Sequence, residues 1–574
     1  MHHALSSIVF AALVSTAARA QSAFVVLKNG DTIPGAGTVS GISGNGDFPV
    51  EIANDGSWCY VSGINGTSST TLLRGNVVVH QNGDVSPGLV NSTLQGLGFE
   101  SIDGRGELAW EAAFSGYGSF GEGVFRGNTF LLKRGDTPLG TGWPAGVTYA
   151  DVNGLQLTSS NKILLSGESN YANPYFAHAF LSVLTCNAQN QLTGEGLVAC
   201  GGVQLPGQPG VVTGISSWPN GHSINDAGQV IYAAGLAPAG AGSDSAVMMW
   251  NNGTSTVLAR EGQPSVLAGT SWLNMVSAPC AIGDNHSAYL AAVSDFRTVI
   301  VKDGAAFAVK GAPFSLSGAV GEYIGSLGMS NRCMSSSGQL AWFVSTGYLQ
   351  TANEGVFVDN QLVFQKDVTS VGGTTVNQLV QASSAGGMSI SPNGRFVIFK
   401  CVLAPNTGAI VVVDRFGGAT TECAGDGTGT PCPCGNNGAS GRGCANSANP
   451  NGALLTASGT ASVANDSLVL HATGMSNGTV LFFEGSSMLN AGAGAIFDDG
   501  LRCAASPTIR LGTKIVAGGA AQYPVAGDSS ISIKGLVPAI GGTRIYQAWY
   551  RDSASFCTAA TSNLTNAISV LWAP

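Results

Sequence analysis

The segment INDAGQVIYAA, which runs from Ile224 to Ala234, contains the clearest structural signal of the chain. Its first half holds the Asn, Asp and Gly residues of a tight turn, and its second half is a continuous apolar run. Apolar runs of this length between turn signals are typical of strands that are buried on both faces. The stretch therefore predicts one turn followed by one strand.

Diluted copies of this phrase recur along the chain. Each copy begins with an apolar residue, and successive copies start 50 to 67 residues apart. The seven copies start at Ile52, Ile102, Leu157, Ile224, Ile282, Met334 and Ile390. The fifth residue of each copy is of a type that tolerates a positive φ. These residues are Gly56, Gly106, Asn161, Gly228, His286, Gly338 and Gly394. The repeat thus predicts the same left-handed turn seven times.

A second phrase follows the first in most copies and has the pattern of a β-hairpin. Two apolar runs flank a pair of Asn, Asp or Gly residues, which is the strongest local hairpin signal. The turns are predicted at Gly75-Asn76, Gly127-Asn128, Asn252-Gly253, Asp303-Gly304 and Asp359-Asn360. The third copy departs from the pattern, with a long insertion between Asn170 and Ser223. A strand and a hairpin with room for a fourth strand predict the blades of a seven-bladed β-propeller over residues 21–418.

The two ends of the array predict that the propeller closes. The seventh copy has a first hairpin arm, Ala409–Arg415, but no second arm. A copy of the missing arm, FVVLKNGD, stands at Phe24–Asp31, ahead of the first repeat. Seven first arms need seven second arms, so the N-terminal strand is expected to complete the last blade and remove the open edges. The alternative is an open array in which Phe24–Asp31 is an ordinary edge strand.

Residues 1–20 have the pattern of an export signal. The apolar segment Ala4–Ala18 is followed by a small-x-small cleavage pattern. No apolar run is long enough to span a bilayer, so no transmembrane segment is expected. The net charge of −9 gives no basic face for nucleic acid. Together with the signal, the 12 cysteines predict disulfides and a secreted or cell-surface protein.

The texture of the sequence changes at Cys423. Residues 419–450 are rich in Gly, Asn and Pro and are interpreted as a linker or disulfide knot. The four cysteines there lack the paired two-residue gaps of a zinc site, so disulfides are favoured over thiolate ligands. Short apolar segments follow and predict a small β-sandwich over 451–574. They lie at 467–474, 479–485, 530–536, 544–552 and 567–574.

The remaining cysteines suggest further bridges. Some lie at equivalent places in neighbouring copies, and others lie close together within one segment. The possible pairs are Cys59–Cys401, Cys280–Cys333, Cys186–Cys200 and Cys503–Cys557. Connectivity does not follow from sequence alone.

The sevenfold phrase resembles the secreted bacterial tandem-repeat proteins named for an NxxGxxAF motif. The match rests on Asn225–Gly228 with the apolar run behind it, on LLKRGDTPLG at 131–140, and covers roughly 24–415. Asn is absent from the first motif position in the six other copies, so periodicity carries the resemblance. The segments CPCGNNG, DDGLRC and YQAWYRD resemble a Cys-containing terminal module of varied secreted bacterial proteins. These resemblances imply export and a surface role, and neither implies a reaction.

Motifs that could carry chemistry lack the context they need. Gly474–Gly478 has the spacing of a nucleophile elbow, but it links two predicted strands and no His follows, so a β-turn is predicted. Gly116–Gly121 has dinucleotide-fingerprint spacing without a βαβ unit. Calcium needs six to eight oxygens, so Asp498-Asp499 and Asp426 are interpreted as solvated turns. Five histidines without metal-ligand spacing are predicted at the surface or in turns: His80, His178, His222, His286 and His471.

No residue is therefore assigned a catalytic, cofactor or metal role. The preferred hypothesis is a secreted or cell-surface binding or structural protein whose partner is an extracellular glycan or surface component. The alternative is an extracellular hydrolase or lyase for polysaccharide, with carboxylates such as Glu111, Asp226 and Asp284 at the propeller mouth. The third hypothesis is a lectin-like role for the β-sandwich alone. Three or more acidic side chains, one of them buried, would favour the enzyme, and a neutral, Gly-lined mouth would favour binding.

Overall fold

The computed structural model divides the chain into two compact units. Of the residues that the structure describes, unit 1 contains Leu27–Val413, and unit 2 contains 22–26 and the residues from Asp414 onward. The structure describes residues 22–42, 48–66, 69–116, 121–171, 178–215, 221–237, 244–316, 321–346, 353–371, 373–379, 386–415, 419–458, 461, 463, 466–539, 542–554 and 556–572. The predicted signal over 1–20 and the centre of the Gly116–Gly121 motif lie outside these residues.

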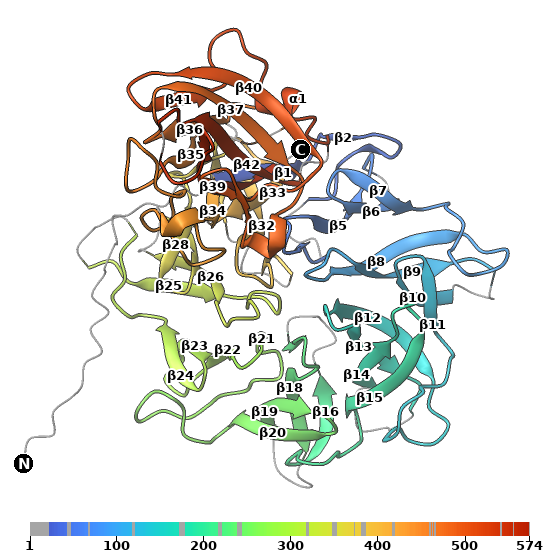
Figure 1. Cartoon of the computed structure of the whole chain (residues 1–574). Helices are drawn as coiled ribbons and strands as arrows, with labels where there is room; N and C mark the ends of the chain where they lie inside the picture. The colour runs from blue at the N-terminus through green and yellow to red at the C-terminus, as the bar shows by residue number, and fades with distance from the viewer. Residues whose placement is uncertain are drawn as a thin grey trace, which may run out of the picture. The chain divides into compact units, whose positions relative to one another are not determined.

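Unit 1 is a succession of antiparallel sheets, most of them with four strands (Figure 1). Sheet 1 contains β4 (Glu51–Ile52), β5 (Trp58–Gly63), β6 (Thr70–Arg74) and β7 (Val77–Gln81). Sheet 2 contains β8 (Leu94–Ile102), β9 (Leu108–Phe114), β10 (Gly121–Arg126) and β11 (Thr129–Lys133). Sheet 3 contains β12 (Tyr149–Leu157), β13 (Lys162–Ser169), β14 (Ala179–Cys186) and β15 (Leu192–Cys200).

The next three sheets follow in chain order. Sheet 4 contains β16 (Val211–Ile215), β17 (His222–Ile224), β18 (Val230–Ala237), β19 (Asp244–Asn251) and β20 (Thr254–Arg260). Sheet 5 contains β21 (Cys280–Ile282), β22 (Ser287–Ala292), β23 (Thr298–Lys302) and β24 (Ala305–Val309). Sheet 6 contains β25 (Ile324–Gly328), β26 (Ala341–Thr346), β27 (Asn353–Val358) and β28 (Gln361–Gln365).

Sheet 7 combines strands from the two ends of the repeat array. It contains β29 (Ser370–Val371), β30 (Thr374–Gln378), β31 (Met388–Ile390), β32 (Phe396–Leu403), β33 (Thr407–Asp414) and, next to β33, β1 (Ser22–Lys28). Just after β1, the Asn29 N–H donates to the Gly408 carbonyl at 2.9 Å. A small separate hairpin pairs β2 (Thr32–Ile33) with β3 (Gly37–Thr38).

The repeated turn is confirmed in six of the seven copies. The fifth residue has a positive φ at Gly56, Gly106, Asn161, Gly228, Gly338 and Gly394. The prediction is wrong at His286, which is not among the residues with positive φ. In this copy the N–H of Gly283 already donates to the His286 carbonyl at 2.9 Å, and β22 begins at the next residue. The turn is one residue shorter there and needs no left-handed position.

All five predicted hairpin turns are confirmed. In each, the two turn residues separate strands whose ends pair directly, as in Arg74 with Val77 and Asn251 with Thr254. The first turn residue has a positive φ between 46° and 58°, as at Gly75 and Asn252. This conformation suits Gly, Asn and Asp, which is why the sequence signal was reliable.

Each sheet of unit 1 packs on the next one. Shared hydrophobic cores join sheets 1 to 2, 2 to 3, 3 to 4 and 4 to 5. Ring contacts join Phe307 to Trp342 and Phe364 to Phe399, between sheets 5 and 6 and between sheets 6 and 7. The ammonium group of Lys400 in sheet 7 lies 5.2 Å from the ring centroid of Tyr60 in sheet 1.

Unit 2 has two main sheets that share one core. The larger sheet contains β34 (Ala419–Cys423), β44 (Ala567–Trp572), β42 (Gly542–Arg551), β43 (Ser562–Leu564), β37 (Gly478–Gly485) and β40 (Thr508–Val516). The smaller contains β35 (Leu454–Ser458), β36 (Val469–Thr473) and β41 (Ala520–Tyr523). Both contribute to a core around Phe482, Tyr523 and Tyr546. A hairpin pairs β38 (Ala495–Phe497) with β39 (Gly500–Arg502).

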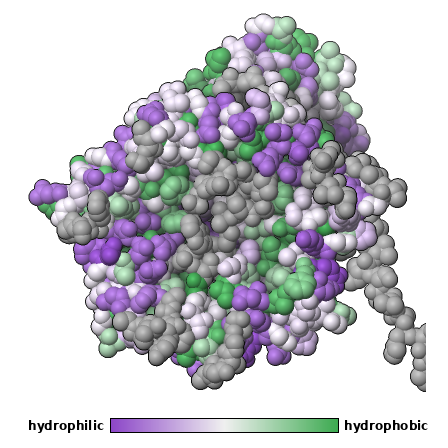
Figure 2. Space-filling view, turned by 180° about the vertical axis from the view of Figure 1, so that it is seen from behind, coloured by the Kyte–Doolittle hydropathy of each residue, from purple (hydrophilic) through white to green (hydrophobic). Residues whose placement is uncertain are grey.

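One predicted strand of unit 2 is wrong. Residues 530–536 form the short helix α1 (Ile531–Lys534) instead. A single turn buries Ile531 as well as a strand would, and the N–H of Ser532 donates to the Asp466 carboxylate at 2.6 Å. Within the described residues, no helix is long and apolar enough to cross a membrane. Hydrophilic and hydrophobic residues are interleaved on the face shown in Figure 2.

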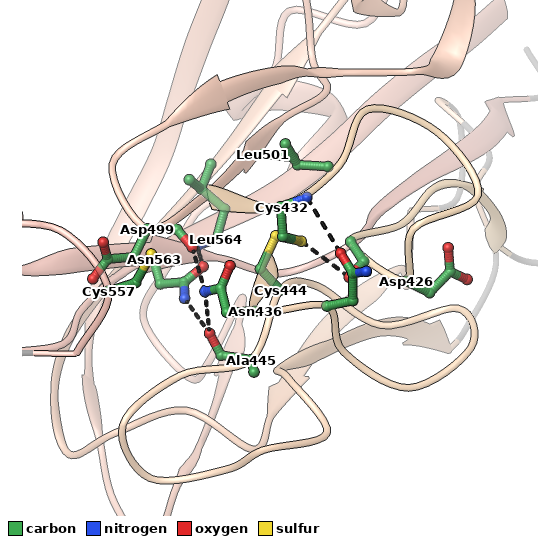
Figure 3. Close-up of a disulfide and its surroundings, with 12 residues drawn as sticks. Asp426, Cys432, Asn436, Cys444, Ala445, Asp499, Leu501, Cys557, Asn563 and Leu564 are labelled. Atoms are coloured by element: carbon green, nitrogen blue, oxygen red, sulfur yellow. Dashed lines mark hydrogen bonds between the residues drawn. A yellow bond between two sulfur atoms is a disulfide. The ribbon is translucent and has the colours of Figure 1, made fainter. Parts of the chain in front are cut away.

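Three disulfides cross-link unit 2, as the cysteine-rich stretch predicts. They are Cys423–Cys503, Cys432–Cys444 and Cys434–Cys557. The expected Cys503–Cys557 pair is wrong because each of these cysteines bonds to the cysteine-rich stretch. Beside the Cys432–Cys444 bridge, the Asn436 and Asn563 side chains donate to the Ala445 carbonyl at 3.0 and 2.9 Å (Figure 3).

The three bridges expected in unit 1 are wrong. Cys59, Cys186, Cys200, Cys280, Cys333 and Cys401 are all buried free thiols. Cys200 stands opposite Phe180 in the β14–β15 pairing, six residues along β14 from Cys186. At about 3.3 Å per residue the two thiols are about 20 Å apart.

We expect the Cys434–Cys557 bridge to stabilise unit 2 more than the Cys432–Cys444 bridge. The two bridges span 123 and 12 residues, and a bridge that closes a longer loop restricts the unfolded chain more. Replacing both partners by Ser should lower the free energy of unfolding by about 5 and about 3 kcal/mol respectively. Denaturant unfolding of the two double variants measures this order, and the reverse order would contradict the loop argument.

Candidate functional site

The first residues of all seven copies line one cavity of unit 1, with a volume of about 80 Å³. They are Ile52, Ile102, Leu157, Ile224, Ile282, Met334 and Ile390. Each ends a strand or bridge at the edge of its sheet that precedes the turn. The apolar residue that opens the phrase therefore has the same place in every copy, at the wall of a shared cavity.

The residue before the phrase fastens one copy to the next. In the first three copies its polar side chain accepts a hydrogen bond from the N–H of the next copy's first residue. These bonds join Ile102 N–H to Glu51 at 3.1 Å, Leu157 N–H to Ser101 at 2.9 Å and Ile224 N–H to Gln156 at 3.0 Å. The residue before the phrase thus fixes the first residue of the next copy at the cavity.

Arg332, two residues before the sixth copy, lines the cavity and bridges several other copies. Its guanidinium lies 2.9 Å from a carboxylate oxygen of Glu51 and donates to Ser101 at 3.1 Å and to the Leu155 carbonyl at 2.6 Å. Its own carbonyl accepts the N–H of Ile390 at 3.0 Å. Burial raises the pKa of Glu51 and lowers that of Arg332, and the ion pair opposes both shifts.

A second set of hydrogen bonds links the turns that follow the first residues of the copies. These bonds include Asn54 N–H to the Gly104 carbonyl, Ser159 N–H to the Asp226 carboxylate, Asn225 side chain to the Gly283 carbonyl, Asp284 N–H to the Ser336 carbonyl, Ser336 N–H to the Pro392 carbonyl and Asn393 N–H to the Asn54 side chain. Arg105 donates to Asn161 at 2.8 Å between the second and third copies. The rim is held by these bonds rather than by flexible loops.

The rim of the cavity carries three aspartates. Asp103 is buried and accepts hydrogen bonds from the Arg105 side chain and from backbone N–H groups of its own turn. Asp226 is half-buried, and Asp284 is exposed. Burial raises the pKa of Asp226, and the carboxylates of Asp284 and Asp103 add to the shift. Together with the buried Glu51, these residues meet the criterion of three or more acidic side chains that would favour an enzyme. However, Glu51 forms an ion pair with Arg332, and Asp103 forms one with Arg105.

Several buried polar atoms of the residues that line the cavity have no hydrogen-bond partner among the described residues, including the side-chain oxygens of Asn331 and Ser389. These two residues are 3% and 2% exposed. Buried polar groups normally have partners, so these oxygens mark a place for water or for a polar group of a ligand.

Glu111 does not lie with Asp226 and Asp284. It is buried on β9, where it accepts the N–H of Phe99 at 3.2 Å. Burial raises its pKa to about 8, and the charges of Glu122 on β10 and Asp151 on β12 add to the shift. Burial and a hydrogen bond with Asp151 raise the pKa of Glu122 to about 7, against the opposing charge of Arg134. These groups form a separate acidic cluster.

The other motif residues have structural roles. Ser476 lies in the predicted turn between β36 and β37 and donates to the Arg551 carbonyl at 2.6 Å. Asp498 and Asp499 form the β38–β39 turn, but the expectation of solvation is wrong for Asp499, which is fully buried and accepts the Thr558 N–H at 2.8 Å. Asp426 accepts N–H groups of Thr428 and Gly441. Among the described residues no three His, Cys, Asp or Glu side chains gather as metal ligands.

One histidine prediction is also wrong. His222 is 3% exposed in β17, and burial, with the nearby Arg332 charge, lowers its pKa to about 3. It precedes the fourth copy by two residues, in the strand that leads into the phrase. The sequence analysis named His222 but predicted it at the surface or in a turn, and it did not single out Arg332, which lies just outside the repeated phrase. The sequence feature that could have identified both residues is an ionisable side chain two positions before the apolar residue that begins a copy.

Comparisons with known proteins add little to this picture. No family model and no curated protein matches the chain. A putative 6-phosphogluconolactonase from Bacteroides fragilis is 10% identical, with a TM-score of 0.25 over 68% of this chain and 91% of that chain. A gluconolactonase from Xanthomonas campestris is 12% identical, with a TM-score of 0.25 over 68% and 96%.

A third similar structure is the WD40 domain of SCAP from fission yeast. It is 7% identical to this chain, with a TM-score of 0.29 over 67% of this chain and 86% of that domain. At such TM-scores none of these likenesses carries an argument about function.

We expect Glu111 to make unit 1 less stable as the pH rises. Its folded-state pKa of about 8 lies above the ordinary value of 4.5, so the folded state binds an extra proton between these pH values. The free energy of unfolding therefore falls through this window, by about 1.4 kcal/mol per unit of pKa difference. In Glu111→Gln, thermal melts at pH 5 to 9 should show a weaker decrease. The matched control Glu107→Gln, at an exposed carboxylate, should keep the wild-type slope.

Proposed function

We propose that unit 1 is a seven-bladed β-propeller closed by the N-terminal strand. The seven sheets found in the described residues would be its blades. Three observations support closure: β1 lies next to β33, the first residues of all seven copies line one cavity, and Asn393 of the last copy donates to Asn54 of the first at 2.7 Å. Such a ring leaves no exposed edge between its first and last repeats.

We also propose that the chain is exported and that unit 2 is a disulfide-bonded β-sandwich, following the divisions at 21–418, 419–450 and 451–574. The signal pattern over 1–20 and the three disulfides of unit 2 support export, since disulfides persist in oxidising compartments. The shared core of its two sheets supports the sandwich.

Within this architecture the protein acts as an extracellular binding protein, and the mouth of the cavity is its recognition site. The observation that carries this proposal is that one position of the repeat is constant in character while another varies. The first residue of the phrase is apolar in every copy, whereas the third residue varies in charge and size. These third residues are Asn54, Gly104, Ser159, Asp226, Asp284, Ser336 and Pro392. Constant apolar first residues with variable third residues suit selective recognition of one partner better than a common catalytic step.

The size and charge of the mouth indicate what it recognises. A cavity of about 80 Å³ holds a few waters or one polar group, well below the roughly 300–1,000 Å³ of sites that enclose small molecules. It is also too small to surround a glycosidic bond, which argues against the polysaccharide hydrolase or lyase. Asp226 and Asp284 place carboxylates on one side of the rim, where they accept hydrogen bonds from hydroxyl groups. We therefore favour the hydroxyl-rich end of an extracellular glycan.

Closure predicts an energetic coupling between the first and sixth copies. In a linear array Glu51 and Arg332 would be far apart, whereas here their charges are paired and buried. We expect Glu51→Leu and Arg332→Met each to cost about 3–5 kcal/mol, and the double variant to recover at least about 2 kcal/mol of the sum. Denaturant unfolding of the four proteins gives the coupling. Glu51→Leu combined with Arg260→Met, which lies in another ion pair, should be additive.

Binding at the mouth predicts a specific loss in two charge-neutral variants. We expect the full chain to bind a subset of an array of extracellular glycans, and Asp226→Asn and Asp284→Asn to weaken that binding at least about 10-fold through lost charge-assisted hydrogen bonds. Asp367→Asn should not change it, because Asp367 is an exposed turn residue outside the cavity. A parallel assay for released sugar should detect no product. Absence of binding, or hydrolysis that Asp226→Asn abolishes, would overturn the proposal.

A further inference from the structure

Unit 2 presents aromatic side chains on the surface of its larger sheet. Trp549 and Arg551 lie on the same face of β42, and the ring of Phe497 at the end of β38 meets the Trp549 ring edge-on at a centroid distance of 6.3 Å. Phe497 is 39% exposed, its neighbour Ile496 is 62% exposed, and Phe556 is 42% exposed. We call Phe497, Trp549 and Arg551 the aromatic platform. Exposed apolar groups of this kind gather at interaction sites more often than at random.

The platform is held in place by the surrounding structure. The indole N–H of Trp549 donates to the Ser562 hydroxyl at 2.8 Å, and that hydroxyl donates in turn to the Asp498 carboxylate. The inner edge of the indole ring packs on the core that contains the disulfides. The polar atom of Trp549 is thus satisfied, and the remaining ring surface does not need to rotate to find a partner. A ligand would pay little conformational entropy on this side.

The backbone on either side of the platform is fixed as well. The carbonyl of Arg551 accepts the Ser476 hydroxyl at 2.6 Å, and Phe556 is followed by Cys557, which is bonded to Cys434. The N–H of Thr558 donates to the buried Asp499 carboxylate at 2.8 Å. Two segments about 60 residues apart in the chain, 496–499 and 556–562, are thereby tied to the same surface.

The charge of the platform comes from Arg551. Its guanidinium carbon lies 5.5 Å from the centroid of the Trp549 ring, a cation–π distance, and the side chain is exposed. Its contact with the Thr561 hydroxyl, at 3.4 Å, is long. A guanidinium presents a planar fork that matches a carboxylate with two parallel hydrogen bonds. The surface therefore offers an apolar ring face and, beside it, a donor fork for an anion.

We propose that the aromatic platform of unit 2 binds an acidic sugar unit, a pyranose ring that carries a carboxylate. The apolar C–H face of the ring packs on Trp549 and Phe497, and the carboxylate pairs with Arg551. A neutral apolar partner would leave the guanidinium without a counter-charge, and a simple anion would not use the exposed rings. This site lies in a different unit from the cavity of unit 1 and does not depend on the function proposed there.

The test uses the full chain and oligomers of polygalacturonate, with fully methyl-esterified oligomers of the same length as the uncharged probe. Calorimetric titration at low and at physiological salt should show binding to the acidic oligomer that weakens with salt, and binding of the ester at least about 10-fold weaker. Arg551→Met should weaken binding of the acidic oligomer about 10-fold, and Phe497→Ala at least about 5-fold. Both residues are exposed, so thermal melts should match those of the wild type.

Two controls make the outcome decisive. Arg510→Met removes another exposed arginine of the same sheet and should leave the affinity unchanged. Asp367→Asn, at an exposed turn of unit 1 outside the cavity, should also leave it unchanged. The proposal is overturned by absence of binding to polygalacturonate, by equal affinity for the esterified oligomer, or by equal losses in Arg551→Met and Arg510→Met.

Discussion

The buried Arg332–Glu51 pair is the constraint on which unit 1 depends. Six inner strands and the Met334 bridge end at one cavity, and their buried backbone N–H and C=O groups need partners there. Arg332 supplies donors to the first three copies at once and accepts from the seventh. Glu51 in turn accepts from Ser101 and Ile102. A charged pair at this place is costly to bury, but it fixes which copies meet and in which register.

This arrangement explains why the repeat can be so diluted and still be recognised by the fold. The left-handed turn and the apolar first residue are the parts of the phrase that the geometry uses in nearly every copy. The other positions face solvent, the rim or a neighbouring turn, and they vary. Specific features gather at those freed positions, as with Asp226 and Asp284 on one side of the mouth. Sequence divergence among the copies is thus a source of asymmetry in an otherwise regular frame.

Much of the fold could be predicted from the sequence, because its signals are local. The Asn/Asp/Gly pairs mark hairpin turns, since these residues adopt positive φ without strain, and all five predicted turns are present. Two of the failures have another origin. The helix in place of a strand at 530–536 and the pairing of Cys503 depend on contacts with residues distant in the chain, whereas the shorter turn at His286 is closed by a local hydrogen bond to Gly283. The site also depends on distant contacts, since Arg332 meets partners up to 281 residues away in sequence.

The two units keep their cysteines in opposite chemical states. Unit 2 holds six in disulfides, whereas unit 1 keeps six thiols apart from one another in sheet interiors, where burial raises the pKa of Cys333 and Cys401 to about 12. A thiol in that state does not attack a disulfide, because the thiolate is the nucleophile. Native packing of unit 1 therefore prevents its thiols from exchanging with disulfides. If a sheet of unit 1 opens under oxidising conditions, newly ionised sulfurs can exchange with existing bridges, and scrambled pairings would then block the way back.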